Sequence, residues 1–188
     1  MQIKFVGSFE TVKSLPRTQF AEYAFIGRSN VGKSSLVNAI AGSVIARTSK
    51  TPGRTQSLNL FNVADRVMLT DLPGYGYAKI SKETADRWLA RLEDYLLTRG
   101  QLKTLFILID ARVGLKDSDL DLMNFCDRAA VPYQMVLTKI DKSNKSDITK
   151  IHNDITCGPR PAMCAEILDT SSEKGLGIEI LRKIIGIK

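Results

Sequence analysis

The chain has 188 residues, of which 44% are hydrophobic, which is enough for one core and too many for a disordered chain. Its formal net charge of +7 at pH 7 suits an anionic partner such as RNA, although an ordinary basic surface would account for it equally well. The first nine residues lack the pattern of a signal peptide, and the longest apolar run, 105–109, is too short to span a bilayer. We therefore expect a single domain over residues 1–188 that is soluble, cytoplasmic and monomeric.

Short apolar segments alternate with helical patterns along the chain. The segments expected to form strands are 23–26, 58–63, 67–70, 105–110, 133–137 and 165–168. Apolar residues at helical spacing follow the first strand, and the same spacing recurs over 85–96, 122–129 and 181–185. The pattern over 85–96 places Trp88 and Leu89 in the core. The alternation predicts an α/β fold: a three-layer sandwich in which helices cover both faces of a mostly parallel, six-stranded sheet.

Residues 27–34, GRSNVGKS, match the phosphate-loop pattern GxxxxGK[ST] between a predicted strand and a predicted helix. Gly27 and Gly32 permit backbone angles and close approaches that a Cβ would obstruct, so that backbone N–H groups can point at phosphates. Lys33 would face the β- and γ-phosphates, and the Ser34 hydroxyl would coordinate Mg²⁺. The pattern predicts a P-loop NTPase in which the whole loop contacts the nucleotide: Gly27, Arg28, Ser29, Asn30, Val31, Gly32, Lys33, Ser34 and Ser35.

A second loop, Asp71-Leu72-Pro73-Gly74, follows the strand predicted over 67–70. A carboxylate at the carboxyl end of that strand can hold Mg²⁺ through a water molecule. The N–H of Gly74 can contact the γ-phosphate, so this loop could sense whether that phosphate is present. The pattern DxxG is weak alone, but it stands at the expected place after the phosphate loop.

The segment Thr138-Lys139-Ile140-Asp141 follows the strand predicted over 133–137 and has the features of a guanine-reading loop. Asp141 can accept hydrogen bonds from N1–H and the 2-amino group of guanine, both of which adenine lacks. The stem of Lys139 can cover the base, and the Thr138 hydroxyl can link neighbouring loops. Further along, the backbone N–H groups of Thr170, Ser171 and Ser172 could contact guanine O6.

A long irregular stretch over 42–57 contains the segment Gly53-Arg54-Thr55-Gln56-Ser57, which we expect to contact the nucleotide. A threonine hydroxyl in this stretch is a natural second protein ligand for Mg²⁺. Thr55, Thr48 and Thr51 are all candidates, and the residue pattern alone does not choose among them.

Together these segments resemble the EngB (YihA) family of bacterial GTPases, within the TrmE-Era-EngA-EngB-septin-like superfamily. The resemblance spans nearly the whole chain and rests on GRSNVGKS (27–34), KTPGRTQ (50–56), DLPGYGYA (71–78), TKID (138–141) and TSS (170–172). It selects Thr55 as the magnesium-binding threonine. It also implies a switch that acts with Mg²⁺ in assembly of the large ribosomal subunit, through rRNA and ribosomal protein, and is needed for normal cell division and septation.

Catalysis is the least defined part of this prediction. Tyr75 occupies the position where Ras-like GTPases carry the glutamine that orients the attacking water, so we expect slow intrinsic hydrolysis and assign no catalytic residue. Asn30 could help to coordinate K⁺ beside the phosphates, or it could only stabilise the loop. A P-loop kinase and a plain RNA-binding module are the alternative functions, but the guanine-reading segment argues against the first, and the lack of RNA-reading aromatic patterns argues against the second.

Overall fold

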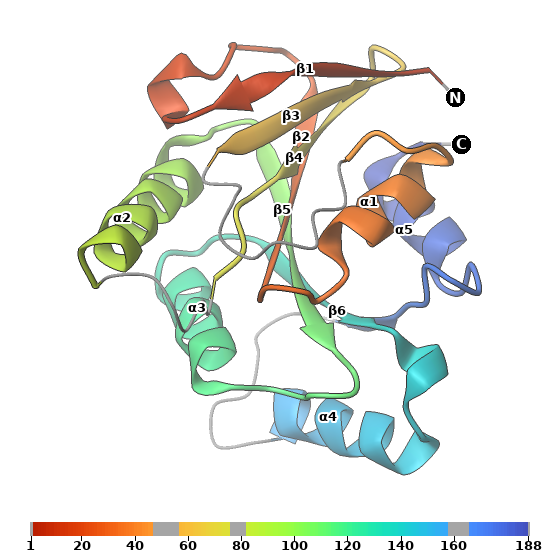
Figure 1. The fold of residues 1–188 in the computed structure, drawn as a ribbon. Helices are drawn as coiled ribbons and strands as arrows, with labels where there is room; N and C mark the ends of the chain where they lie inside the picture. Colours follow the sequence, from red (N-terminus) through yellow and green to blue (C-terminus); the bar gives the residue numbers. More distant parts are fainter. Residues whose placement is uncertain (1, 47–56, 76–81, 158–165, 188) are drawn as a thin grey trace.

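The computed structural model describes residues 2–46, 57–75, 82–157 and 166–187. Within these residues, seven strands form one sheet in the order β1-β3-β4-β2-β5-β6-β7 (Figure 1). The strands are β1 (Ile3–Phe9), β2 (Ala21–Gly27), β3 (Leu58–Val63), β4 (Val67–Asp71), β5 (Leu102–Asp110), β6 (Tyr133–Thr138) and β7 (Ile167–Asp169). The helices are α1 (Lys33–Ala41), α2 (Lys82–Thr98), α3 (Asp117–Arg128), α4 (Lys145–Cys157) and α5 (Ile178–Ile185), with short 3₁₀ helices η1 (Val12–Ser14) and η2 (Ile140–Lys142).

The sheet is mostly parallel, as predicted. Strands β4, β2, β5, β6 and β7 pair in parallel, whereas β3 is antiparallel to both β1 and β4. The five parallel strands therefore end at the same edge of the sheet. Because β2 lies in the middle, the loop that follows it stands between the loops that follow β4 and β5, which is where open α/β sheets commonly bind ligands.

Two buried clusters, one on each face of the sheet, account for the three predicted layers. Alternate residues of β5 face opposite ways: Leu105, Ile107 and Ile109 join one cluster, and Phe106 and Leu108 join the other. The first cluster contains side chains of α2, α3 and α4, and the second contains side chains of α1 and α5. Figure 1 shows α1 and α5 side by side, on the opposite side of the sheet from α2 and α3.

Three details differ from the sequence prediction. Strand β1 was not predicted, because it is an exposed edge strand whose register shifts between Phe5 and Gly7, which hides a regular apolar alternation. Leu89 is 48% exposed, whereas Trp88 packs against the core as expected. Strand β7 begins at Ile167, and the start predicted for it, Ala165, lies outside the described residues.

Helices α3 and α4 contain Cys126, His152 and Cys157, none of which belongs to the nucleotide-binding loops predicted above. The His152 side chain is half-buried on α4, with Nε2 2.8 Å from Asp169 Oδ1. Cys126 is buried and Cys157 is exposed; both are free thiols, and Cys164 lies outside the described residues. Among the helices that the structure describes, none combines the length and apolar character of a membrane span.

Candidate nucleotide-binding site

The phosphate loop joins the end of β2 to the start of α1. Two glycines in it are required by geometry: Gly32 has φ 101°, and a Cβ on Gly27 would lie 2.9 Å from both the Leu108 carbonyl oxygen and Val31 Cγ1. Asn30 also adopts a left-handed conformation, with φ 64°, which asparagine tolerates better than most residues. The spacing of glycines in the motif therefore follows from the shape of this turn.

Not every N–H group of the loop is free to face a phosphate. The N–H of Ser29 donates to the Tyr75 carbonyl at 3.2 Å, and that of Val31 donates to the Arg28 carbonyl at 3.1 Å. The N–H groups of Lys33, Ser34 and Ser35 lie in the first turn of α1, where an α-helix leaves its donors without intrahelical partners. Free N–H groups at a helix start are suited to binding an anion, so these three are the candidate phosphate donors of the loop.

The Lys33 ammonium and the Asp71 carboxylate form an ion pair that joins the first two loops. The parallel pairing of β2 with β4 sets Phe25 opposite Asp71, which brings the end of β4 beside the phosphate loop. Both side chains are largely buried, with exposed fractions of 14% for Lys33 and 7% for Asp71. The residues predicted to contact phosphate and metal, Lys33 and Asp71, are thus in contact with each other, and the half-buried Ser34 follows Lys33 at the start of α1.

The loop after β4 runs alongside the phosphate loop. The Leu72 N–H donates to the Phe25 carbonyl at 3.0 Å, and the Tyr75 N–H donates to the Gly27 carbonyl at 3.3 Å. Leu72 and Pro73 are buried, and Gly74 is half-buried. The backbone on either side of Gly74 is therefore held by hydrogen bonds to β2.

The loop after β6 contacts the phosphate loop through two side chains. The Thr138 hydroxyl donates to the Val31 carbonyl at 2.6 Å, which confirms the predicted link between loops. Lys139, with φ 58°, extends its ammonium to the Asn30 carbonyl at 2.5 Å. Its Cε lies 3.3 Å from where a Cβ on Gly32 would stand, so the lysine stem passes close to that glycine.

Asp110, at the end of β5, is a site residue that the sequence analysis missed. Its carboxylate accepts from Lys139 Nζ at 2.8 Å and from Arg112 Nε and Nη2 at 2.9 and 2.7 Å. Burial raises the pKa of Asp110, but the hydrogen bonds from Arg112 and Lys139 outweigh burial and lower the pKa to about 2. A signal was present, because Asp110 ends an uninterrupted apolar strand at the same sheet edge as Asp71 and Thr138.

The segment after β7 holds the Asp141 loop in place. The Ile140 N–H donates to the Thr170 carbonyl at 3.2 Å, and a hydrogen bond from the Ser171 side chain lowers the pKa of the exposed Asp141. However, the N–H groups of Thr170 and Ser171 donate to the Leu137 and Leu176 carbonyls at 2.7 and 3.0 Å. Of the three N–H groups expected to face guanine O6, that of Ser172 is therefore the remaining candidate.

Two groups of predicted site residues remain. The Arg28 side chain turns away from the loop, because Nη2 donates to the Gly114 carbonyl at 2.7 Å and Nε lies 3.2 Å from Asp119 Oδ2. Only the Arg28 backbone can therefore face a ligand.

Ser57 is half-buried just before β3. The other predicted residues of that segment lie outside the described residues: Gly53, Arg54, Thr55 and Gln56.

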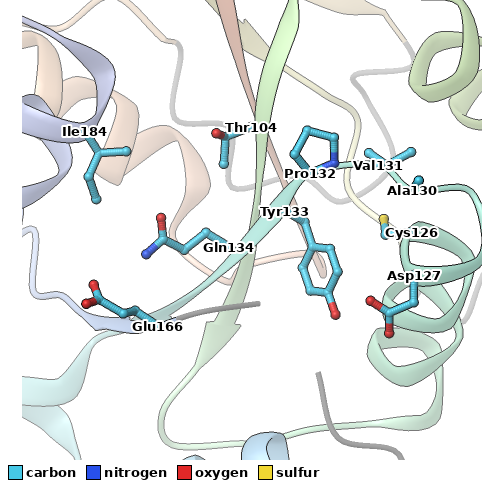
Figure 2. Close-up of a pocket in the computed structure, with 10 residues that line it drawn as sticks. All are labelled: Thr104, Cys126, Asp127, Ala130, Val131, Pro132, Tyr133, Gln134, Glu166 and Ile184. Carbon is cyan, nitrogen blue, oxygen red and sulfur yellow. The ribbon is translucent and has the colours of Figure 1, made fainter. Parts of the chain in front are cut away.

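A separate cavity of about 610 Å³ contains none of the predicted site residues. Figure 2 shows its lining, which includes Thr104 near the start of β5 and Tyr133 and Gln134 at the start of β6. The amino-terminal ends of these strands lie at the opposite edge of the sheet from Asp110 and Thr138. This cavity therefore lies apart from the residues predicted to contact the nucleotide.

Comparison with known proteins agrees with this geometry. A family model described as "50S ribosome-binding GTPase" matches residues 22–139, which include β2 through the start of the Asp141 loop. A probable GTP-binding protein EngB of Sinorhizobium fredii is 47% identical, over 95% of this chain and 88% of the relative. One from Cereibacter sphaeroides is 44% identical, over 96% of this chain and 85% of the relative.

Solved structures show the same fold. A crystal structure of a probable GTP-binding protein EngB has a TM-score of 0.72 at 21% identity, covering 88% of this chain and 97% of that chain. Aquifex aeolicus Era bound to GDP and AlF₄⁻ has a TM-score of 0.70 at 25% identity, over 89% of this chain and 56% of that chain. The chain belongs to the EngB family of GTP-binding proteins and is a GTPase.

Proposed function

We propose that this protein is a slow GTPase switch whose GTP-bound state binds the large ribosomal subunit or its precursor. The observation that carries the proposal is the meeting of three loops at one sheet edge, through the Lys33–Asp71 ion pair and the contacts of Thr138 and Lys139 with the phosphate loop. In this arrangement the phosphates lie against the start of α1, Gly74 meets the γ-phosphate, and Asp141 pairs with guanine.

The oxygen donors near the phosphate loop suit Mg²⁺, which prefers hydroxyl, carboxylate and water ligands. Ser34 and Thr55 would bind the ion directly, and Asp71 would hold it through water. When bound, Mg²⁺ neutralises charge on the β- and γ-phosphates. Lys33 would keep a second positive charge beside the same phosphates.

The burial and the hydrogen bonding of the Tyr75 side chain support slow hydrolysis. Its side chain is 7% exposed, and its hydroxyl donates to Asp119 Oδ1 at 2.8 Å. A buried and engaged phenol is a poor means of orienting an attacking water. The rest of the described loops supply positioning and charge, which alone give a low intrinsic rate.

The ribosomal partner is supported by the family description and by where the basic residues stand in the sequence. Arg47, Lys50, Arg54 and Lys79 lie in the segments 47–56 and 76–81, which contain no aspartate or glutamate and adjoin the proposed switch residues. Basic residues attract the phosphates of rRNA, and residues next in sequence to the proposed switch could do so in a way that depends on the nucleotide. The proposed role in cell division and septation, the cytoplasmic location and the monomeric state follow from the family resemblance.

Co-sedimentation with purified large ribosomal subunits would test the partner. We expect the protein to pellet with these subunits in a non-hydrolysable GTP analogue and to stay in the supernatant with GDP, with binding falling as salt increases. Purified small subunits and the Lys33→Ala variant are the controls. Equal pelleting in both nucleotides, or equal pelleting with small subunits, would contradict a nucleotide-controlled role at the large subunit.

A monovalent cation could compensate for the missing glutamine. We propose that the Asn30 side chain helps to hold K⁺ beside the phosphates, because Asn30 is exposed at the tip of the loop and its own carbonyl is already engaged by Lys139. A cation there would stabilise charge that develops in the transition state. Hydrolysis should be faster in KCl than in NaCl at matched ionic strength, and Asn30→Ala should remove the difference. Equal rates for the unmodified protein in the two salts would exclude this role.

A further inference from the structure

A polar cluster lies beside the nucleotide site, and two of its three residues, Tyr75 and Asp119, are outside the predicted binding residues. It consists of Tyr75, Asp119 and Arg28, which come from the end of the loop after β4, the first turn of α3 and the phosphate loop. The Tyr75 hydroxyl donates to Asp119 Oδ1 at 2.8 Å, and Arg28 Nε lies 3.2 Å from Asp119 Oδ2. Asp119 is fully buried, so these contacts take the place of the hydrogen bonds that its carboxylate would make with water.

Asp119 also caps the N-terminal end of α3. Its Oδ2 accepts from the Lys116 N–H at 2.8 Å, which makes it part of a helix-capping arrangement. Burial raises the pKa of Tyr75 well above its usual value, so the phenol keeps its proton and acts as the donor at neutral pH. The cluster is therefore anchored on a helix end that does not itself belong to the nucleotide site.

The same tyrosine is fixed through its backbone. Its N–H donates to the Gly27 carbonyl at 3.3 Å, and its carbonyl accepts from the Ser29 N–H at 3.2 Å. Its ring also packs near Trp88 of α2, with ring centroids 6.2 Å apart. The hydroxyl, the backbone and the ring of Tyr75 therefore all make contacts that fix its position. The residue immediately before it, Gly74, is the proposed donor to the γ-phosphate.

We infer that Tyr75, Asp119 and Arg28 act as positioning residues that fix the Gly74 N–H relative to the phosphate loop and thereby set the preference for GTP over GDP. Arg28 ties the phosphate loop to Asp119, and Tyr75 ties the Gly74 loop to the same carboxylate. The Asp119 carboxylate therefore links the side chains of the two loops, in addition to the backbone hydrogen bonds between Tyr75 and the phosphate loop. A donor fixed in advance binds the γ-phosphate without a further ordering cost.

This inference rests on the proposed function, and a hydroxyl deletion tests it separately. Tyr75→Phe removes the donor to Asp119 and keeps the ring beside Trp88. We expect the affinity for a non-hydrolysable GTP analogue to fall about 10-fold, because the Gly74 N–H is held less well, while the affinity for GDP stays unchanged. Isothermal titration with both nucleotides in Mg²⁺ measures the ratio of the affinity for the GTP analogue to the affinity for GDP.

Tyr95→Phe is the matched control. Tyr95 is also a buried tyrosine whose hydroxyl donates to a buried carboxylate, that of Glu22, but Glu22 lies near the start of β2 and far from the loops. A purely structural effect would lower the thermal midpoint in both variants and leave both GTP-to-GDP affinity ratios as in the unmodified protein. We expect only Tyr75→Phe to change the ratio.

Asp119→Asn gives a second, independent measurement. It keeps the shape of the side chain and an acceptor for Tyr75 but removes the charge that holds Arg28, so the ratio should shift in the same direction. An unchanged ratio in both Tyr75→Phe and Asp119→Asn would overturn the inference. Failure of the proposed function would look different, because the unmodified protein would then pellet equally with large ribosomal subunits in both nucleotides, whatever the affinity ratios of the variants.

Discussion

Replacing Lys33 by alanine should weaken binding of both GTP and GDP by a factor on the order of 100 or more. The Lys33 side chain is 14% exposed at the start of α1, so the attraction of its ammonium to phosphate is only partly screened by water. In the free protein the same ammonium pairs with Asp71, so the variant also leaves a largely buried carboxylate without its cation. Isothermal titration measures the affinities, and circular dichroism checks that the variant is folded.

Two further variants sharpen this test. Lys150→Ala removes the same charge from an exposed position on α4 and should bind nucleotide normally, which controls for the change in net charge. Ser34→Ala keeps Lys33 but removes the proposed magnesium ligand, so its binding should be nearly the same in Mg²⁺ and in EDTA. If Lys33→Ala bound nucleotide as tightly as Lys150→Ala, the phosphate-loop assignment would be wrong.

The arrangement of the loops was predictable because each motif directly follows an apolar run. The segments 67–70, 105–110 and 133–137 each read as a buried strand, and the polar residue after or at the end of each one had to emerge at an edge of the sheet. Parallel pairing brings those ends to the same edge, so Lys33, Asp71 and Thr138 meet there. Local pattern and one topological rule were therefore sufficient to bring these loops to one edge of the sheet, although they did not identify Asp110 as a contact of Lys139.

Side-chain partners between distant segments were not predictable in the same way. Arg28 belongs to the phosphate-loop motif, yet its guanidinium turns to Asp119 on α3 and to the Gly114 carbonyl. Nothing in the motif encodes the position of α3, which depends on how that helix packs over the sheet. The edge strand β1 was missed for a related reason, since pairing with β3 and not a buried apolar face defines it.

The sequence motifs also did not predict which backbone N–H groups of the loops are free to bind a ligand. The sequence suggested that consecutive N–H groups face the ligand, but those of Ser29, Val31, Thr170 and Ser171 are engaged within the protein. Such hydrogen bonds depend on the exact path of the turn, which a residue pattern does not specify. The structure therefore removes these four N–H groups from the candidate donors to the ligand.

Asp141→Asn should reverse the base preference of the site from guanine to xanthine. The carboxylate can accept hydrogen bonds from guanine N1–H and the 2-amino group, and an asparagine amide presents an N–H to the latter instead. We expect the affinity for GTP to fall on the order of 100-fold and that for xanthosine triphosphate to rise, because its 2-oxo group accepts from the amide. Competition titrations with both triphosphates measure the change.

The structure suggests why this exchange should leave the loop intact. Asp141 is exposed, and the Ser171 side chain that donates to it can donate equally to the carbonyl oxygen of asparagine. Lys139 and Thr138 hold the same loop through contacts that do not involve residue 141. Asp154→Asn, at an exposed position on α4, makes the same change in charge and should leave both affinities unchanged. An Asp141→Asn protein that still preferred GTP over xanthosine triphosphate would show that another residue reads the base.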